Sequence, residues 1–252
     1  MTDSTPTHRS SVSAVLIVFN EERNLAACLE SVKWADEVIV VDGHSTDRTP
    51  ELARQSGAKV YQNTFSGYGP QKQFALERAA CGWILSIDAD ERVTPELRDE
   101  ILKVLDKSSG VDGFEIPFKN VFFGKWLKHS GLYPDYHLRL FRRTAAEFTS
   151  AKIHESVLVR GRVGRLNHPM LHCSYPTVAS YVQKMNRYTA LLAEGGATFR
   201  LNHMLFSPVS KFFRLYLGRR GYLDGFTGLV YCLLAAFFNF VKDAKAWEKS
   251  HS

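Results

Sequence analysis

The chain has 252 residues, of which 45% are hydrophobic and 23% are charged. These proportions exclude wholesale disorder, and the length suits one domain with appendages or two small domains. The formal charge of +6 is unevenly spread, because the interval between Glu194 and Asp224 contains five lysines or arginines and no acid. Such a segment attracts phosphate groups, whether of nucleic acid, of lipid headgroups or of a phosphorylated substrate.

Residues 1–11 are polar and lack an apolar core, so we expect a short disordered lead and no secretory signal. The cysteines at 28, 81, 173 and 232 are scattered without a C-x-x-C pair. Three of them stand in apolar surroundings, where a cysteine acts as a small hydrophobic residue. We therefore expect a reduced, cytoplasmic protein.

Four short runs rich in Val and Ile follow, at 13–20, 37–42, 58–63 and 83–88. They are continuously apolar rather than alternating, which is typical of parallel strands covered on both faces. Amphipathic helical patterns separate them. Strand and helix in alternation predict β-α-β units with right-handed crossovers, so residues 12–105 should form a half-sheet of the nucleotide-binding type.

The pattern changes after residue 105. Strand-like runs at 113–124, 137–143 and 152–161 predict a mixed sheet, and 177–196 predicts a helix. An apolar stripe begins at Leu205, and 229–238 is an apolar decamer, too short to span a bilayer. We expect a catalytic domain at 12–175, with halves at 12–105 and 106–175, and a basic, apolar helical region at 176–252.

Polar side chains follow three of the four apolar runs. Asn20 and Glu21 follow the first, Asp42 ends the second, and Asp88-Ala89-Asp90-Glu91 ends the fourth. The carboxyl ends of parallel strands form the ligand-binding edge of an open sheet. Carboxylates there can accept hydrogen bonds from a ribose or a base, but they bind phosphates only through a cation. The chain lacks a Gly-rich phosphate loop, so we expect Asp88 and Asp90 to divide sugar contact and Mg²⁺ or Mn²⁺ binding.

Three segments together resemble the donor-binding half of glycosyltransferase family 2, which are inverting enzymes with the GT-A fold: LIVFNEERNLAACLESV, VIVVDGHSTDRTPELA and WILSIDADERVTPEL. The resemblance covers about the first 105 residues. It implies an α/β GT-A fold with a mostly parallel sheet, a smaller mixed-sheet acceptor part and a nucleotide-sugar donor. It also implies that Asp42 contacts the uracil or ribose and that Asp88-Ala89-Asp90 binds the nucleotide and its metal. Lys72 matches a segment beside the nucleotide; an exposed helix lysine is the alternative.

Inverting transfer requires a carboxylate that deprotonates the acceptor hydroxyl. Many family members use an E-D pair, which this sequence lacks in the expected region. KIHESV instead resembles the histidine-glutamate motif of a subset that modifies bacterial lipopolysaccharide core, and PDYHLRLFRR upstream matches too. Glu155 is therefore the predicted base, and Asp135 is the reserve candidate. The alternative for Glu155 is an edge-strand acid balanced by Lys152 or Arg160.

Two further features have competing interpretations. The spacing of His168, His172 and Cys173 could suggest zinc, but Pro169 breaks the helix that this spacing needs. We expect structural histidines, with His172 as an additional candidate ligand of the rim metal. The basic stretch 200–220 is either a packed helix or, as we predict, an interfacial element that binds anionic lipid.

The sequence thus predicts a membrane-peripheral, metal-dependent hexosyltransferase at the inner face of a bacterial cell membrane, with no nucleic-acid partner. The resemblance implies transfer of β-linked glucose from UDP-glucose to an inner-core heptose of lipopolysaccharide. One alternative acceptor is another cell-envelope glycan. A haloacid-dehalogenase-like phosphatase is a second alternative, since ILSIDADERVT imitates its motif, but it leaves Asn20 and Asp42 without a role. A non-enzymatic lipid- or nucleic-acid-binding protein leaves the whole acidic rim unexplained.

Overall fold

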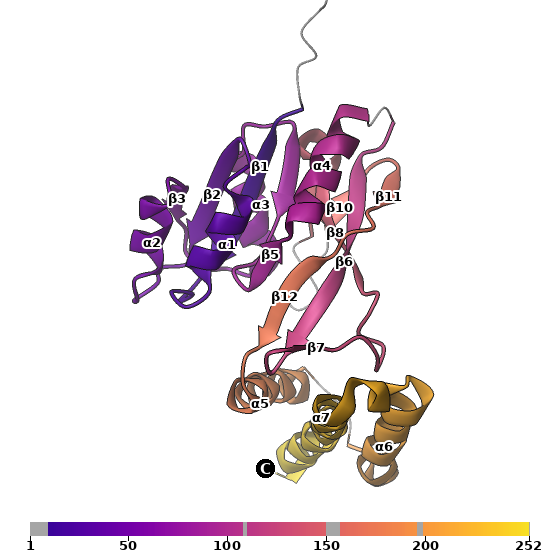
Figure 1. Cartoon of the computed structure of the whole chain (residues 1–252). Helices are drawn as coiled ribbons and strands as arrows, with labels where there is room; N and C mark the ends of the chain where they lie inside the picture. Colours follow the sequence, from indigo (N-terminus) through magenta and orange to yellow (C-terminus); the bar gives the residue numbers. More distant parts are fainter. Residues whose placement is uncertain (1–9, 108–109, 150–156, 196–198, 252) are drawn as a thin grey trace, which may run out of the picture. The chain divides into compact units, whose positions relative to one another are not determined.

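The computed structural model describes residues 10–107, 110–149, 157–195 and 199–251. The chain divides into two compact units. Unit 1 comprises the residues up to 118 together with 136–171, and unit 2 comprises 119–135 together with the residues from 172 onward. Figure 1 shows the elements of the chain, coloured along the sequence.

Unit 1 begins with the predicted parallel half-sheet. Its strands are β1 (Val12–Val18), β2 (Glu37–Asp42), β3 (Lys59–Gln62) and β4 (Trp83–Ser86), in the order β3-β2-β1-β4. The intervening helices are α1 (Leu25–Val32), α2 (Thr49–Gln55) and α3 (Tyr68–Arg78), and α4 (Pro95–Lys107) follows. Each neighbouring pair of these strands is parallel, so the predicted β-α-β arrangement is confirmed.

Both faces of this half-sheet are covered, which explains why its strands are apolar without alternation. Ala14 and Leu16 of β1 belong to one buried cluster with residues of α1 and α4. Val15, which points to the opposite face, belongs to a second cluster with Ala75 and Leu76 of α3. Burial on both sides removes the need for polar positions within the strands.

The sheet of unit 1 continues as the predicted mixed sheet. β8 (Tyr136–Arg142) pairs antiparallel with β4 and with β6 (Gly113–Phe122), and β12 (Met170–Tyr175) and the short β5 (Glu91–Val93) complete the order. β11 (Val163–Arg165) pairs with the start of β6. A 3₁₀ turn η1 (Arg143–Ala145) leads to β9 (Ala146–Phe148), which pairs with β10 (Val157–Val159). Of the strand predicted at 152–161, residues 152–156 lie outside the described part of the chain.

Unit 2 is mainly helical. It contains β7 (Lys125–Trp126), α5 (Val178–Glu194), α6 (Leu201–Phe213), the π-helical turn η2 (Arg214–Gly218), the 3₁₀ turn η3 (Gly221–Asp224) and α7 (Gly225–His251). Thr177 caps α5 by accepting a hydrogen bond from the Ser180 N–H. Phe122, Leu127, Tyr181 and Met185 form the buried core of this unit.

Helix α7 is longer than the apolar decamer at its centre. It runs for 27 residues because good helix formers such as Ala and Lys follow the decamer without a break. Gly221–His251 is consequently the one stretch of the described residues that is long and apolar enough to cross a membrane, judged by length and composition alone. By length and composition, this helix therefore differs from the expected apolar segment that is too short to span a bilayer.

Candidate functional site

The parallel strands of unit 1 bring the polar ends of β1, β2 and β4 to one edge. Val18 is in register with Asp42 across β1 and β2, and Val15 is in register with Ser86 across β1 and β4. Asn20, Asp42 and Asp88 therefore lie at or just beyond the carboxyl edge of the same sheet, where open parallel sheets bind ligands.

Asn20 and Glu21 join the loops that follow β1 and β2. The backbone N–H of Asn20 donates to Ser45 Oγ at 2.8 Å, and Asn20 Oδ1 accepts from the Thr46 N–H at 2.8 Å. The Glu21 N–H donates to Thr49 Oγ1 at 2.7 Å. Asn20 adopts a left-handed conformation, with φ of 55°, which asparagine tolerates better than most residues. These two residues thus shape the edge of the sheet.

Asp42 is fully buried at the end of β2. Both of its carboxylate oxygens accept from the Ser45 N–H at 3.2 Å. A carboxylate offers about four lone-pair sites, so this contact does not use all of its acceptor capacity. Asp42 therefore combines a fixed position with remaining acceptor capacity.

Asp88 lies between two cations contributed by other elements. Arg139 Nη2 of β8 donates to Asp88 Oδ2 at 2.8 Å, and Lys72 Nζ of α3 lies 3.3 Å from Asp88 Oδ1. Burial alone would raise the pKa of Asp88, but the charges of Arg139 and Lys72 outweigh it and hold that pKa well below its ordinary value. Lys72 is only 8% exposed, so the alternative of an exposed helix lysine is wrong.

Glu91 is the buried member of a charge cluster that also contains Lys72, Asp88 and Arg139. Its side chain is almost fully buried, accepts a hydrogen bond from Arg139 Nη2 and accepts another from the Asp88 N–H at 3.0 Å. Burial raises the pKa of Glu91 to about 8, although Arg139 opposes the shift. One guanidinium thus orients two carboxylates of the Asp-Ala-Asp-Glu segment.

Two arginines that hold this segment are not among the site residues predicted from the sequence. Arg139 lies between Leu138 and Leu140 in β8. A cation between two apolar residues of a strand is the signal that could have marked it, because a buried charge needs a partner. Arg92 donates from Nη1 to the carbonyls of Ala89 and Glu91 at 2.7 Å, and from Nη2 to the Asn24 carbonyl at 2.8 Å. Arg92 thereby ties the turn between β4 and β5 to α1.

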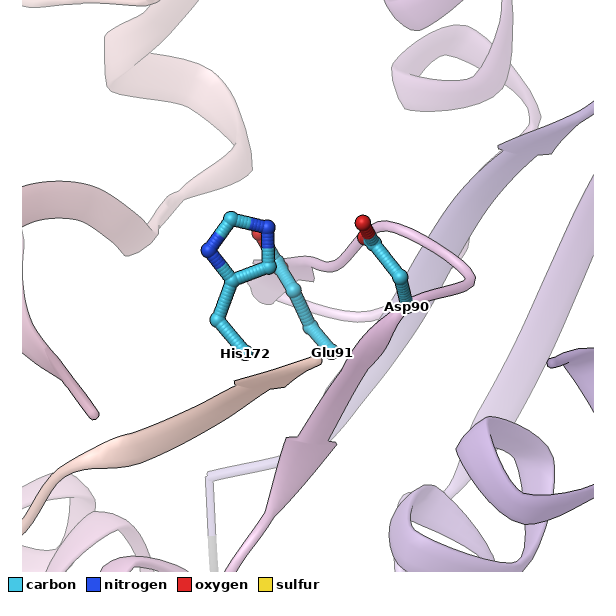
Figure 2. A group of neighbouring side chains, drawn as sticks. All are labelled: Asp90, Glu91 and His172. Carbon is cyan, nitrogen blue, oxygen red and sulfur yellow. The ribbon is translucent and has the colours of Figure 1, made fainter. Parts of the chain in front are cut away.

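Asp90 is the candidate metal ligand of this turn. An oxygen of Asp90 and one of Glu91 lie within 4.8 Å of each other, close enough to approach one cation. Figure 2 shows both side chains together with His172, the first residue of unit 2 on strand β12. Within unit 1, the oxygens of these two carboxylates are ligands that suit Mg²⁺ or Mn²⁺. The residues present therefore fit a divalent cation.

His172 is held in one orientation by contacts within unit 2. Asn120 Nδ2 donates to the Leu132 carbonyl at 3.2 Å, so its Oδ1 faces His172 Nδ1 at 2.7 Å. Ser174 Oγ lies 3.0 Å from the same nitrogen, so two polar side chains fix the orientation of the His172 ring. Ligand histidines in metal sites are commonly oriented in this way.

The remaining predicted site residues are placed as follows. Glu155, the predicted base, lies outside the described residues. Asp135 is half-buried in unit 2, directly after the cis peptide bond between Tyr133 and Pro134. His168 has the structural role expected of it, since its Nδ1 lies 2.9 Å from Glu100 Oε2, and the segment after Pro169 is a strand rather than a helix.

Comparison with known proteins matches residues 13–158 to the family described as Glycosyl transferase family 2. The chain is 32% identical over 243 residues to "Lipopolysaccharide core biosynthesis glycosyltransferase LpsC" of Rhizobium meliloti, covering 89% of this chain and 90% of that protein. It is 32% identical over 256 residues to an uncharacterized glycosyltransferase of Rickettsia felis, covering 94% of this chain and 89% of that protein. Among solved structures, S. aureus TarS 1-349 is similar with a TM-score of 0.49 and 17% identity over 96% of this chain and 91% of that one.

The family match covers more than half of the chain, and the similarity to the two relatives covers most of its length. The parallel half-sheet, its acidic carboxyl edge and the mixed sheet that follows agree with the fold that the resemblance implied. This similarity also leaves the haloacid-dehalogenase-like alternative without support. The chain belongs to glycosyltransferase family 2 and has the GT-A fold.

Proposed function

We propose that the protein transfers glucose from UDP-glucose to an inner-core heptose of lipopolysaccharide, with inversion at the anomeric carbon. The observation that carries the proposal is the Asp88-Ala89-Asp90 turn at the carboxyl edge, with Asp88 held between Lys72 and Arg139. The relative from Rhizobium meliloti, which is named for lipopolysaccharide core biosynthesis, supports the choice of acceptor. Transfer to another cell-envelope glycan is the second candidate.

The edge of the sheet supplies the proposed donor contacts. Asp42 accepts hydrogen bonds from the uracil or the ribose, and the loops shaped by Asn20 and Glu21 surround the nucleotide. Asp88 accepts from the ribose, and Lys72 lies beside the diphosphate. The position of Asp42 at the carboxyl edge of the sheet and the contact of Lys72 with Asp88 support these roles.

A divalent cation, Mg²⁺ or Mn²⁺, is proposed to bind Asp90, with Asp88 and His172 as further candidate ligands. Asp90 and Glu91 offer oxygens close together, and Asn120 and Ser174 orient the His172 ring through contacts at Nδ1. When bound, the cation neutralises the charge that develops on the leaving diphosphate. Glu91 is proposed to orient Arg139 and thereby Asp88, because Arg139 contacts both carboxylates.

Glu155 is the proposed base, by its match to the histidine-glutamate motif. The acceptor oxygen forms a bond to the anomeric carbon from the face opposite the diphosphate, while the bond from that carbon to the phosphate oxygen breaks. The acceptor proton passes to the carboxylate of Glu155, and UDP leaves. Asp135 is the reserve base.

The proposed domain plan assigns 12–105 to the donor half, 106–175 to the acceptor half and 176–252 to membrane association, after a lead at 1–11. A lipid-linked acceptor favours an enzyme that works peripherally at the inner face of the cell membrane. The acid-free basic interval before Asp224 supports this location.

A donor panel tests the proposal. Purified protein is incubated with lipopolysaccharide core acceptor, Mn²⁺ and one of UDP-glucose, UDP-galactose, UDP-N-acetylglucosamine or GDP-mannose, and the products are identified by mass spectrometry. We expect a single added hexose with UDP-glucose. The same assay compares Asp90→Asn, which alters the proposed metal ligand, with its matched control Asp99→Asn on the exposed side of α4. Absence of transfer from every donor would refute the proposed reaction, and transfer from a different donor would correct the sugar.

A further inference from the structure

Helix α6 exposes its apolar side chains. Seven of its thirteen residues are large and apolar, and none of its residues is buried. Five of the seven are more than half exposed, with Phe206 the highest at 68%: Leu201, Leu205, Phe206, Val209 and Phe213. Exposed apolar surface of this extent is unusual on a protein that is surrounded only by water, and it marks a surface that something covers.

Helix α7 carries a second exposed apolar stripe. Its members are separated by seven, four, three and seven residues, which places them along one side of the helix: Phe226, Leu233, Phe237, Phe240 and Trp247. Phe226 is 79% exposed and Leu233 is 51% exposed. The two helices that pack against each other thus both direct large apolar side chains outward.

The seam between α6 and α7 contains hydrogen-bonded polar side chains. His203 Nδ1 lies 2.6 Å from Asp243 Oδ2, and the Asp243 side chain is buried. Lys211 Nζ donates to Asn239 Oδ1 at 2.9 Å, and Asn239 Nδ2 donates to Ser207 Oγ at 2.7 Å. A helical hairpin in water directs its polar residues outward, whereas this hairpin directs large apolar residues outward. Hydrogen bonds between helices contribute to helix association in an apolar medium, together with close packing.

The charges around this hairpin favour a lipid surface as the medium. Arg214, Arg219 and Arg220 are exposed in the segment that joins the two helices, and no acid occurs between Glu194 and Asp224. Anionic headgroups attract such a cluster. A second copy of the chain fits less well, because twofold contact through the same surface would bring identical arginine clusters together.

The contacts on the inner side of α7 favour a helix that lies along the lipid surface. Tyr231, Leu234 and Phe238 pack against the core of unit 2. Lys245 Nζ donates to the carbonyl and to the side-chain oxygen of Asn186 in α5, both at 2.6 Å. Because protein covers this side of the helix, only the outward stripe is available to lipid.

We propose that the α6–α7 hairpin inserts its outward apolar side chains into one leaflet of an anionic membrane, with Arg214, Arg219 and Arg220 among the headgroups. The hairpin then anchors the protein by apolar contact as well as by charge. This membrane anchor is independent of which sugar the enzyme transfers.

Vesicle co-sedimentation of the full chain tests the proposal. The vesicles contain either phosphatidylcholine alone or equal parts of phosphatidylglycerol and phosphatidylcholine. We expect wild type to sediment with the anionic vesicles and the double variant F206S/F237S to lose at least about tenfold in partitioning, since each lost apolar side chain removes buried area. High salt should weaken wild-type binding but abolish that of the double variant. Leu158→Ser, at a 57% exposed position of unit 1, is the matched control and should bind as wild type does.

A second measurement follows the depth of insertion. Trp247 is 47% exposed on α7, so its fluorescence should shift to the blue and be quenched by lipids brominated on their acyl chains. The variant W247F should lose most of that quenching while still binding vesicles.

Three outcomes would overturn the proposal. The first is equal sedimentation of wild type and F206S/F237S, and the second is sedimentation of wild type with neither kind of vesicle. The third is a wild-type protein that is dimeric and binds no vesicles, together with a double variant that is monomeric. The last would assign the surface to a second copy. Resistance of the bound protein to alkaline extraction would replace the in-plane arrangement with a helix that crosses the bilayer.

Discussion

Arg139 donates from Nη2 to Oδ2 of Asp88 at 2.8 Å, and this contact joins the second half of the sheet to the acidic turn at the end of the first half. The two residues are 51 positions apart. β8 carries Arg139 beside β4, whose end leads directly into Asp88. The charge cluster is therefore a product of the antiparallel pairing of β8 with β4.

Removing Arg139 should destabilise the fold. Arg139→Ala leaves Asp88 with Lys72 alone and removes the hydrogen-bond partner of the buried Glu91, and leaving a buried polar group without its partner costs about 1–3 kcal/mol in the free energy of unfolding. Urea denaturation measures this loss. Arg165→Ala removes an exposed ion pair with Glu115 and should cost at most about 1 kcal/mol. Equal losses in the two variants would contradict the role given to Arg139.

Asp90→Asn should abolish most metal-dependent transfer while leaving the fold intact. The substitution keeps the shape of the side chain but removes the charge that a cation needs. Charge stabilisation by a bound metal is worth several kcal/mol, so we expect transfer to fall more than about 100-fold. Initial rates with Mn²⁺ and after chelation measure the effect. Full Mn²⁺-dependent activity in Asp90→Asn would remove Asp90 from the metal site, and Asp99→Asn should be unaffected.

Glu155→Gln separates binding from chemistry. If Glu155 is the base, the variant should bind UDP as wild type does and transfer the sugar about 10²–10⁴ times more slowly. Calorimetry measures UDP binding, and single-turnover assays measure the transfer step. Asp135→Asn is the companion variant. Normal transfer by Glu155→Gln together with slow transfer by Asp135→Asn would move the base assignment to Asp135.

Glu100 should contribute to the free energy of unfolding by an amount that depends on pH. Burial alone would raise its pKa, but the N–H groups of Asn167 and His168 outweigh this and lower the pKa of Glu100 below its ordinary value of 4.5. A lowered carboxyl pKa stabilises the fold above the unfolded-state pKa, and the stabilisation is lost as pH falls through the folded-state pKa. Glu100→Gln should therefore cost about 1–2 kcal/mol at pH 7 and progressively less below about pH 4.5.

Thermal or urea unfolding of wild type and Glu100→Gln across this pH range checks the difference. Glu30→Gln is the control, because Glu30 forms an exposed pair with Lys33 and its loss should change stability little at any pH. A gap between wild type and Glu100→Gln that stays constant into acid would show that ionisation of Glu100 contributes nothing.

The sequence by itself determined the first half of the fold and the composition of its ligand-binding edge. Continuous Val- and Ile-rich runs between amphipathic helices leave a parallel sheet as the arrangement that buries both faces. Once the sheet is parallel, Asn20, Asp42 and Asp88 must share an edge, because the carboxyl ends of its strands coincide. Local pattern was enough for these conclusions, since each depends on residues within one β-α-β unit or its neighbour.

The tertiary structure alone decided which partners those side chains have. The helical position of Lys72 is compatible with an exposed or a buried lysine, and only the packing of α3 against the sheet places it beside Asp88. Arg139 and Arg92 were likewise missed, because the atoms that they contact belong to other elements or to backbone carbonyls.

The same division holds in unit 2. Periodicity shows that 200–220 has an apolar stripe and basic residues, but it cannot show which side of the helix is covered. The pairing of His203 with Asp243, 40 positions away, turns the polar side of α6 toward α7 and leaves the apolar side exposed. The hydrophobic pattern determines which residues form the apolar face of a helix, whereas long-range hydrogen bonds and packing determine whether that face is exposed.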